Sequence, residues 1–272
     1  MVRSMAEFDL DAYVGRSKAL DLSAFPWDDV PHHPVSAEAV RTLRYMQDIE
    51  SHTIIYLREL LATRAVDDPE VATFLACWLY EETFHGIALA RFLEAAGHPV
   101  GPREQPRGQD PWIKRLEATG MSIVSKAWPD FCAAHMTWGA INELTTLTGY
   151  RRLAAVARHP VLTELLDAIV LDESRHFFFY YRQADIRLRR SPNAARVARL
   201  LVDKFWAPVG SGVQPRRELE FLARYLFVDA DGRAAMRKAD DTIRRLPGFA
   251  TVQLLDAWVN RYVGGANGHG HH

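Results

Sequence analysis

The amino-acid sequence predicts an all-α fold, in which a four-helix bundle is followed by further helices. Apolar residues recur at three- and four-residue steps through several long segments. Ser, Asp and Pro stand where such segments would begin, and no alternating pattern of strand length competes with the helical one. The 272 residues suffice for one domain that buries a polar site away from water.

The first half of the chain predicts an N-terminal arm and two long helices. Residues 1–35 are polar and interrupted by proline, so we expect an extended arm that lies on the body of the protein. Helix-start residues and apolar periodicity predict helices over residues 36–64 and 68–97. Residues 98–129 are expected to form a long crossover that includes a shorter helix over 110–126.

The second half predicts two more long helices and a helical C-terminal region. These long helices are expected over residues 129–158 and 160–190, separated by a tight break. Residues 191–264 are predicted to form helices packed on the bundle, around a turn at 231–232. Residues 265–272 are a histidine-containing tail that could bind a metal ion weakly.

Charge balance, cysteine positions and hydropathy indicate where the protein works and which partners it lacks. The chain has 33 basic and 34 acidic residues, and this balance gives no indication of a nucleic-acid or anionic membrane partner. Cys77 and Cys132 lie in apolar helical stretches, and the N-terminal residues do not resemble a secretory signal. These features predict a cytoplasmic protein with reduced thiols. No stretch offers about 18 consecutive apolar residues, so we also expect no membrane span.

Two copies of one short motif, Glu-x-x-His, carry the predicted chemistry. Glu82 with His85, and Glu173 with His176, each place a carboxylate and an imidazole on one helix face. Either copy alone is a common chance pattern. However, Glu50 and Glu143 lie in the preceding long helices, 32 and 30 residues before the motif glutamates.

Helix lengths bring these residues to one level. About 14 residues separate Glu50 from the end of its helix, and about 14 separate the start of the next helix from Glu82, which is about 21 Å in each direction. The second pair of helices repeats this geometry. The six candidate metal ligands are therefore Glu50, Glu82, His85, Glu143, Glu173 and His176.

This ligand set predicts a two-metal centre. A single glutamate in such a helix ordinarily faces solvent or forms a salt bridge, but four buried carboxylates require cations to neutralise them. Carboxylate and imidazole ligands without thiolate favour iron or manganese over structural zinc. We expect two iron ions per chain, with manganese as the alternative, in a ferritin-like bundle over residues 36–190.

The residues before the motif glutamates, Glu81 and Asp172, predict a supporting layer. Acids at these positions can accept the free imidazole N–H of a ligand histidine and fix its orientation. The alternative is that both acids are solvated on a helix face.

The motifs resemble those of the soluble acyl-acyl carrier protein desaturases, including their short actinobacterial type. EETFHG and DESRH are similar to the family's EENRHG and DEKRH, and Trp78 matches a tryptophan before the first motif. ESHTIIY resembles the family's first ligand segment, and NELTTLTGYRRLA resembles its third. The resemblance covers about residues 36–190. It implies that Trp78 and Arg175 join Glu81 and Asp172 around the ligands.

The resemblance also implies an activity and partners. The family's members are homodimers that use O₂ and electrons from a ferredoxin-type donor to introduce a double bond into an acyl chain on acyl carrier protein. Thr146 stands where many members have a threonine beside the oxygen site, where it could relay a proton or instead bond back to its own helix. Acyl carrier protein is acidic, so it would dock at a basic cluster on this protein. The candidate cluster is Arg182, Arg187, Arg189 and Arg190, with Arg196 and Arg199 just beyond. Alternatively, these arginines are simply a charged helix face exposed to solvent.

Two departures from the family pattern leave other functions open. Phe84 replaces an arginine and Phe177 replaces an acid beside the motif histidines. The aromatic run 177–181 could wall a substrate channel or pack against neighbouring helices. A di-iron hydroxylase or N-oxygenase of a small metabolite, a ferroxidase, and a helical scaffold without metal are the alternatives to the desaturase.

Overall fold

The protein is described from a computed structural model, and all regular structure in its described part is helical. The predicted all-α fold class is confirmed. The described residues are 7–61, 63–101, 128, 130–211 and 214–264.

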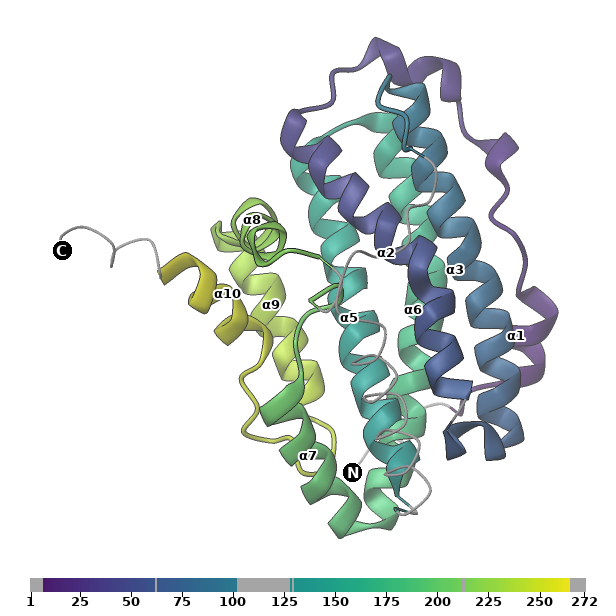
Figure 1. Cartoon of the computed structure of the whole chain (residues 1–272), viewed down its shortest axis with the longest axis vertical. Coiled ribbons are helices and arrows are strands. Elements are labelled where there is room, and N and C mark those ends of the chain that lie inside the picture. The colour runs from purple at the N-terminus through teal and green to yellow at the C-terminus, as the bar shows by residue number, and fades with distance from the viewer. Residues whose placement is uncertain (1–6, 62, 102–127, 129, 212–213, 265–272) are drawn as a thin grey trace.

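Four long helices form the bundle (Figure 1). The pair α2 and α3 and the pair α5 and α6 are each joined by a short connection, and the two pairs pack against one another. Most of the connection between α3 and α5, including the predicted helix over 110–126, lies outside the described residues. The bounds are α2, Ala37–Leu61; α3, Pro69–Ala95; α5, Phe131–Ala157; and α6, Pro160–Arg190.

Local sequence chemistry sets where these helices begin. The Ser36 hydroxyl accepts the amide hydrogen of Ala39 at the start of α2. Asp68 accepts two amide hydrogens at the start of α3, and proline occupies the first helical position there and in α6. Arg158, with φ +51°, ends α5 in the left-handed conformation, and the ring of His159 then caps α6. These caps fix the helix lengths that bring the two motifs to one height.

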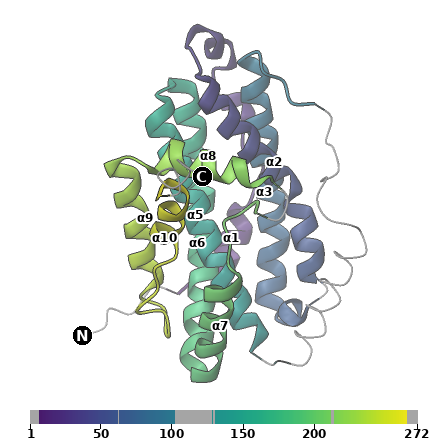
Figure 2. The ribbon, with the colours of Figure 1, turned by 60° about the vertical axis from the view of Figure 1, so that its left-hand side comes forward.

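The C-terminal helices pack against one side of the bundle, mainly along α5 (Figures 1 and 2). They are α7, Pro192–Phe205; α8, Arg216–Phe227; α9, Ala230–Ile243; and α10, Leu255–Gly264. The turn predicted at 231–232 is wrong, because the side chain of Asp229 accepts the amide hydrogen of Gly232 and starts α9 two residues earlier. Arg152 of α5 donates to the Leu226 carbonyl and the Asp229 carboxylate, and so ties this layer to the bundle.

The N-terminal segment is not extended throughout. It contains α1, Leu10–Arg16, capped by the Asp9 side chain, and the 3-10 helices η1, Leu22–Ala24, and η2, Trp27–His32. A further 3-10 helix, η3, Arg64–Asp67, joins α2 to α3. Helix α1 packs on the outer side of α3 (Figure 1).

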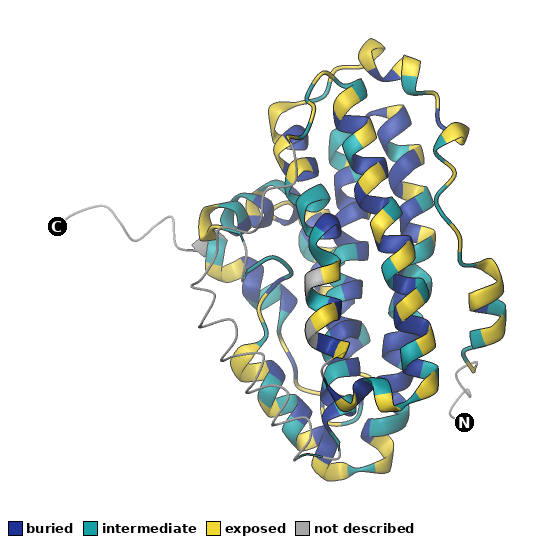
Figure 3. Cartoon of the chain, turned by 45° about the vertical axis from the view of Figure 1, so that its right-hand side comes forward, coloured by how far each residue is buried: buried dark blue, intermediate teal, exposed yellow. Residues whose placement is uncertain are grey.

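Burial follows the facing sides of the long helices (Figure 3). One continuous apolar core runs through the bundle and into the C-terminal layer, and its largest fully buried side chains include Phe74, Phe92, Tyr150 and Tyr180. Among the described residues, no helix combines the length and apolarity needed to cross a membrane. The tail at 265–272 lies outside the described residues.

Candidate metal centre

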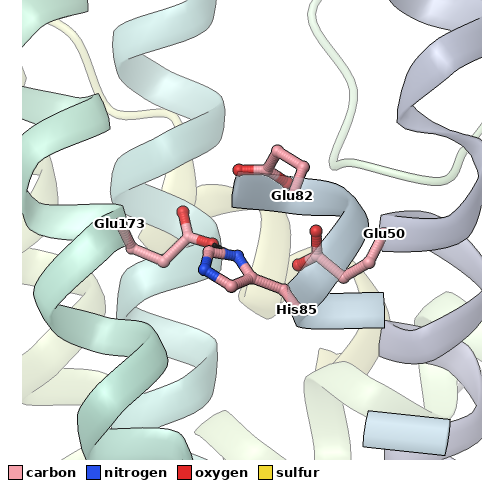
Figure 4. Close-up of side chains that lie close together, drawn as sticks. All are labelled: Glu50, Glu82, His85 and Glu173. Atoms are coloured by element: carbon pink, nitrogen blue, oxygen red, sulfur yellow. Dashed lines mark ion pairs between the residues drawn. The ribbon is translucent and has the colours of Figure 1, made fainter. Parts of the chain in front are cut away.

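The structure brings together all six residues that the sequence selects as candidate ligands. They come from four different helices and are at most 6% exposed, although four of the six are glutamates. Figure 4 shows Glu50 of α2, Glu82 and His85 of α3, and Glu173 of α6 around a common space. Glu143 of α5 and His176 of α6 complete the cluster.

The cluster divides into two overlapping groups of four residues. Glu50 and His85 belong to the first group and Glu143 and His176 to the second, while Glu82 and Glu173 belong to both. Within each group, one donor atom per residue lies within 4.8 Å of every other. Two cations held this way would share two carboxylates and have one carboxylate and one imidazole each.

Both histidines present one ring nitrogen to the cluster. Nδ1 of His85 is 3.2 Å from a Glu173 oxygen, and Nδ1 of His176 is 3.1 Å from a Glu82 oxygen. These two nitrogens, one Glu82 oxygen and both Glu173 oxygens are buried without a hydrogen-bond partner among the described residues. Buried polar atoms rarely lack partners, so this set of inward-facing donors fits a pair of divalent cations.

The other ring nitrogen of each histidine is held by an acid from the opposite motif. Nε2 of His85 lies 3.1 Å from Asp172, and Nε2 of His176 lies 2.7 Å from Glu81. Arg175 reaches both acids, with a contact to Asp172 and a 3.4 Å contact to Glu81. The contacts therefore cross between α3 and α6, and they turn both Nδ1 atoms inward.

The electrostatics of the cluster are those of crowded, buried carboxylates. Burial, reinforced by Glu82, raises the pKa of Glu50 well above its usual value, and burial together with Glu173 does the same for Glu143. Burial also acts to raise the pKa of Glu173, but the ionic interactions with His176 and His85 outweigh it and lower that pKa. Burial opposes protonation of His85, yet its contacts with Asp172 and Glu173 raise its pKa to about 9. Cations would relieve this crowding by neutralising the carboxylates together.

Two tyrosines that the sequence does not single out contact a candidate ligand or an acid that holds one. The Tyr150 hydroxyl donates to a Glu50 oxygen, and the Tyr13 hydroxyl donates to Glu81 at 2.9 Å. Tyr150 follows Glu143 by seven residues, two helical turns, so the periodicity of α5 could have revealed it. Nothing in the sequence connects Tyr13, in the N-terminal arm, to the cluster.

An apolar cavity adjoins the Glu50 side of the cluster. Its interior volume is about 70 Å³, which is smaller than the range of about 300–1,000 Å³ typical of small-molecule pockets. Thr146 lines it beside Glu50, whereas the neighbouring Thr145 hydroxyl bonds back to its own helix. The other lining residues come from α2, α5, α8, α10 and the segment before α8, and they include Met46, Ile49, Leu222, Leu226, Phe227 and Trp258.

The aromatic residues that the sequence selects lie elsewhere. Trp78 packs edge-on against Tyr180 and makes no hydrogen bond to a candidate ligand among the described residues. Phe179 stacks on Phe74 with ring centroids 3.7 Å apart. None of the residues 177–181 lines the cavity, so this run packs the bundle.

Part of the predicted basic cluster is engaged within the protein. Arg187 pairs with Asp68, while Arg182 and Arg189 both reach Asp185. Arg190 is exposed. An open groove beyond the end of α6 is lined by Arg189, Arg196 and Arg199.

Comparison with known proteins identifies the family. The model of the family described as "Fatty acid desaturase" matches residues 53–210, more than half of the chain. The chain therefore belongs to the fatty acid desaturase family, which confirms the family resemblance of the motifs and places the protein among the oxidoreductases. No curated protein sequence matches the chain significantly.

Two solved structures resemble the chain. One is an R2-like ligand-binding oxidase with an aerobically reconstituted metal cofactor after photoconversion, with 14% identity, a TM-score of 0.58, and coverage of 96% of this chain and 92% of the other. This likeness supports the fold. The other is DesA2 from Mycobacterium tuberculosis H37Rv, a candidate acyl-ACP desaturase, with 19% identity, a TM-score of 0.46, and coverage of 94% and 91%.

Proposed function

We propose that the chain is an O₂-dependent di-iron oxidase that introduces a double bond into an acyl chain carried by acyl carrier protein. The observation that carries the proposal is the pair of buried four-residue groups that share Glu82 and Glu173, next to an apolar cavity. Membership of the fatty acid desaturase family supports the reaction class.

The proposed ligand assignment follows the two groups. Glu50 and His85 would hold one iron ion, Glu143 and His176 would hold the other, and Glu82 and Glu173 belong to both groups. Bound iron, supplied with O₂ and two electrons, provides the power to oxidise an unactivated C–H bond, which no amino-acid side chain has.

The protein's own residues would position the substrate, hold a proton and orient the ligand histidines. The mostly apolar cavity lining would place part of an apolar chain beside Glu50 and Thr146. The Thr146 hydroxyl makes no hydrogen bond to another described residue, so in this proposal it is free to hold a proton at the edge of the site. Glu81 and Asp172 keep the ligand histidines oriented.

The proposal includes three partners. Acyl carrier protein, which is acidic, would dock at the groove of Arg189, Arg196 and Arg199 and at the exposed Arg190. Arg189 and Arg199 also pair with Asp185 and Asp203, whereas Arg182 and Arg187 are paired and less exposed than Arg189. A ferredoxin-type donor would supply electrons. A second copy of the chain would form a homodimer.

A reconstituted assay tests the proposed reaction. The protein is loaded with ferrous iron, given a ferredoxin system and O₂, and offered a series of acyl carrier protein thioesters whose products are weighed by mass spectrometry. A loss of two mass units supports desaturation. A gain of sixteen would identify a hydroxylase instead, and unchanged acyl chains throughout the series would direct the search to small metabolites.

Two variants link that activity to the site. Glu82→Gln removes a carboxylate shared by both groups and is expected to abolish the reaction together with stoichiometric iron binding. Glu94→Gln changes an exposed glutamate of the same helix and should leave both unaffected. Retention of two iron ions by Glu82→Gln would refute the ligand assignment.

A further inference from the structure

We propose that Tyr13, in the N-terminal helix α1, is a positioning residue for the metal centre, because its hydroxyl fixes Glu81, the acid that holds His176. The inference rests on the proposed two-metal centre and adds a contribution from a part of the chain that precedes the family match at residues 53–210. Helix α1 reaches the centre because it packs on α3, the helix that carries Glu81 (Figure 1).

The contact is a buried chain of hydrogen bonds. The Tyr13 hydroxyl donates to Oε2 of Glu81 at 2.9 Å, and the same oxygen is 2.7 Å from Nε2 of His176. Tyr13 is 3% exposed, Glu81 is 1% exposed and His176 is fully buried. Water therefore cannot easily replace the phenol as a donor to this carboxylate.

The two ligand histidines are supported differently. Asp172, which holds His85, makes a close contact with Arg175. Glu81 receives Arg175 only at 3.4 Å, so Tyr13 is its main donor other than His176 itself. Removal of the Tyr13 hydroxyl would leave the Glu81 carboxylate free to rotate, and His176 would lose its fixed direction.

The role can be separated from ordinary packing. The Tyr13 ring lies against Phe8 and Phe74, with centroids 5.5 and 5.3 Å away. Tyr13→Phe keeps this ring packing and removes only the hydroxyl. If Tyr13 only packs, Tyr13→Phe should change metal binding little. If the Tyr13 hydroxyl positions Glu81, Tyr13→Phe should weaken metal binding at the site that includes His176.

A cobalt titration makes this distinction without relying on activity. Full-length protein is titrated anaerobically with Co²⁺, and visible absorption follows ion binding. We expect Tyr13→Phe to weaken one of the two binding steps by up to roughly tenfold, the lower end of the loss that is typical for a residue bonded directly to a metal ligand, as Glu81 is. The other step should stay as in the unmodified protein, because the contact of Asp172 with His85 is untouched.

Two further comparisons identify the route of the effect. Tyr181→Phe removes another buried tyrosine hydroxyl, one that donates to the Thr242 carbonyl at 3.2 Å, and should leave both binding steps unchanged. Glu81→Gln should weaken the same step as Tyr13→Phe, and the double variant should bind no more weakly than Glu81→Gln alone.

Each contrary result overturns the inference in a distinguishable way. Two unchanged binding steps in Tyr13→Phe would refute it and leave the proposed function intact. An equal loss in Tyr181→Phe would show a general packing effect, and additive losses in the double variant would show that Tyr13 does not act through Glu81. If the unmodified protein binds fewer than two ions, the proposed centre fails, and this inference fails with it.

Discussion

Replacement of Glu143 by Gln should halve the stabilisation that metal gives to the protein. Glu143 belongs to only one of the two four-residue groups, so the variant retains the complete group of Glu50, Glu82, His85 and Glu173. Binding of an ion at 100 times its dissociation constant adds about 2.7 kcal/mol to the free energy of unfolding. Two sites should therefore contribute about 5 kcal/mol, or roughly 10 °C in melting temperature for a chain of this size.

Glu143→Gln should thus gain roughly 5 °C from metal rather than roughly 10 °C. Without metal, its melting temperature should equal or exceed that of the unmodified protein, because burial and Glu173 raise the pKa of Glu143 and already favour its neutral form. A neutral amide of the same shape therefore costs little there.

Anaerobic differential scanning calorimetry with and without Fe²⁺ measures both effects. Glu94→Gln, on the exposed end of α3, is the matched control and should gain as much from Fe²⁺ as the unmodified protein. The reasoning is refuted if Glu143→Gln keeps the full gain, or if it melts several degrees lower than the unmodified protein when both are free of metal.

Three other predictions test the fold around the centre. Gly139→Ala should lower the free energy of unfolding by about 1–3 kcal/mol, because the added Cβ would overlap the buried ring of Tyr180. Gly15→Ala, where the added Cβ meets no atom within 4 Å, should not destabilise the protein. Equal urea midpoints for the two variants would contradict this prediction. Arg152→Met should cost roughly 2 kcal/mol by breaking charged hydrogen bonds to the C-terminal helices, and an unchanged urea midpoint would show that these bonds do not anchor that layer. Burial lowers the pKa of His135 to about 4, so its contribution to stability is complete above about pH 6.5 and falls, by no more than about 3 kcal/mol, as the pH drops toward 4. His135→Gln should flatten the decline in stability between pH 6.5 and 5, and an identical decline in both proteins would contradict the assignment.

The candidate ligands were predictable because they depend on spacing within helices. Glu82 with His85 and Glu173 with His176 each share a helix face, and the helix lengths place Glu50 and Glu143 at the same height. The caps that fix those lengths, Ser36 and Asp68 among them, are local signals that the sequence displays.

Contacts between separate elements were less predictable. The acids Glu81 and Asp172 were expected to hold histidines, but the crossed pairing with His176 and His85 depends on how α3 faces α6. Tyr13 reaches Glu81 only because α1 folds onto α3, and no periodic pattern in the N-terminal arm indicates this. The turn predicted at 231–232 is wrong for a local reason. The side chain of Asp229 caps the N-terminus of α9, so residues 231 and 232 lie inside the first turn of that helix.

Iron counting combined with X-ray absorption spectroscopy tests the central claim most directly. The full-length protein is loaded anaerobically with Fe²⁺, freed of excess metal, and examined for iron content and iron–iron scattering. The shared carboxylates Glu82 and Glu173 predict two iron ions per chain with an iron–iron vector at about 3.5–4 Å. Fewer than two ions per chain, or two ions without that vector, would contradict a carboxylate-bridged pair.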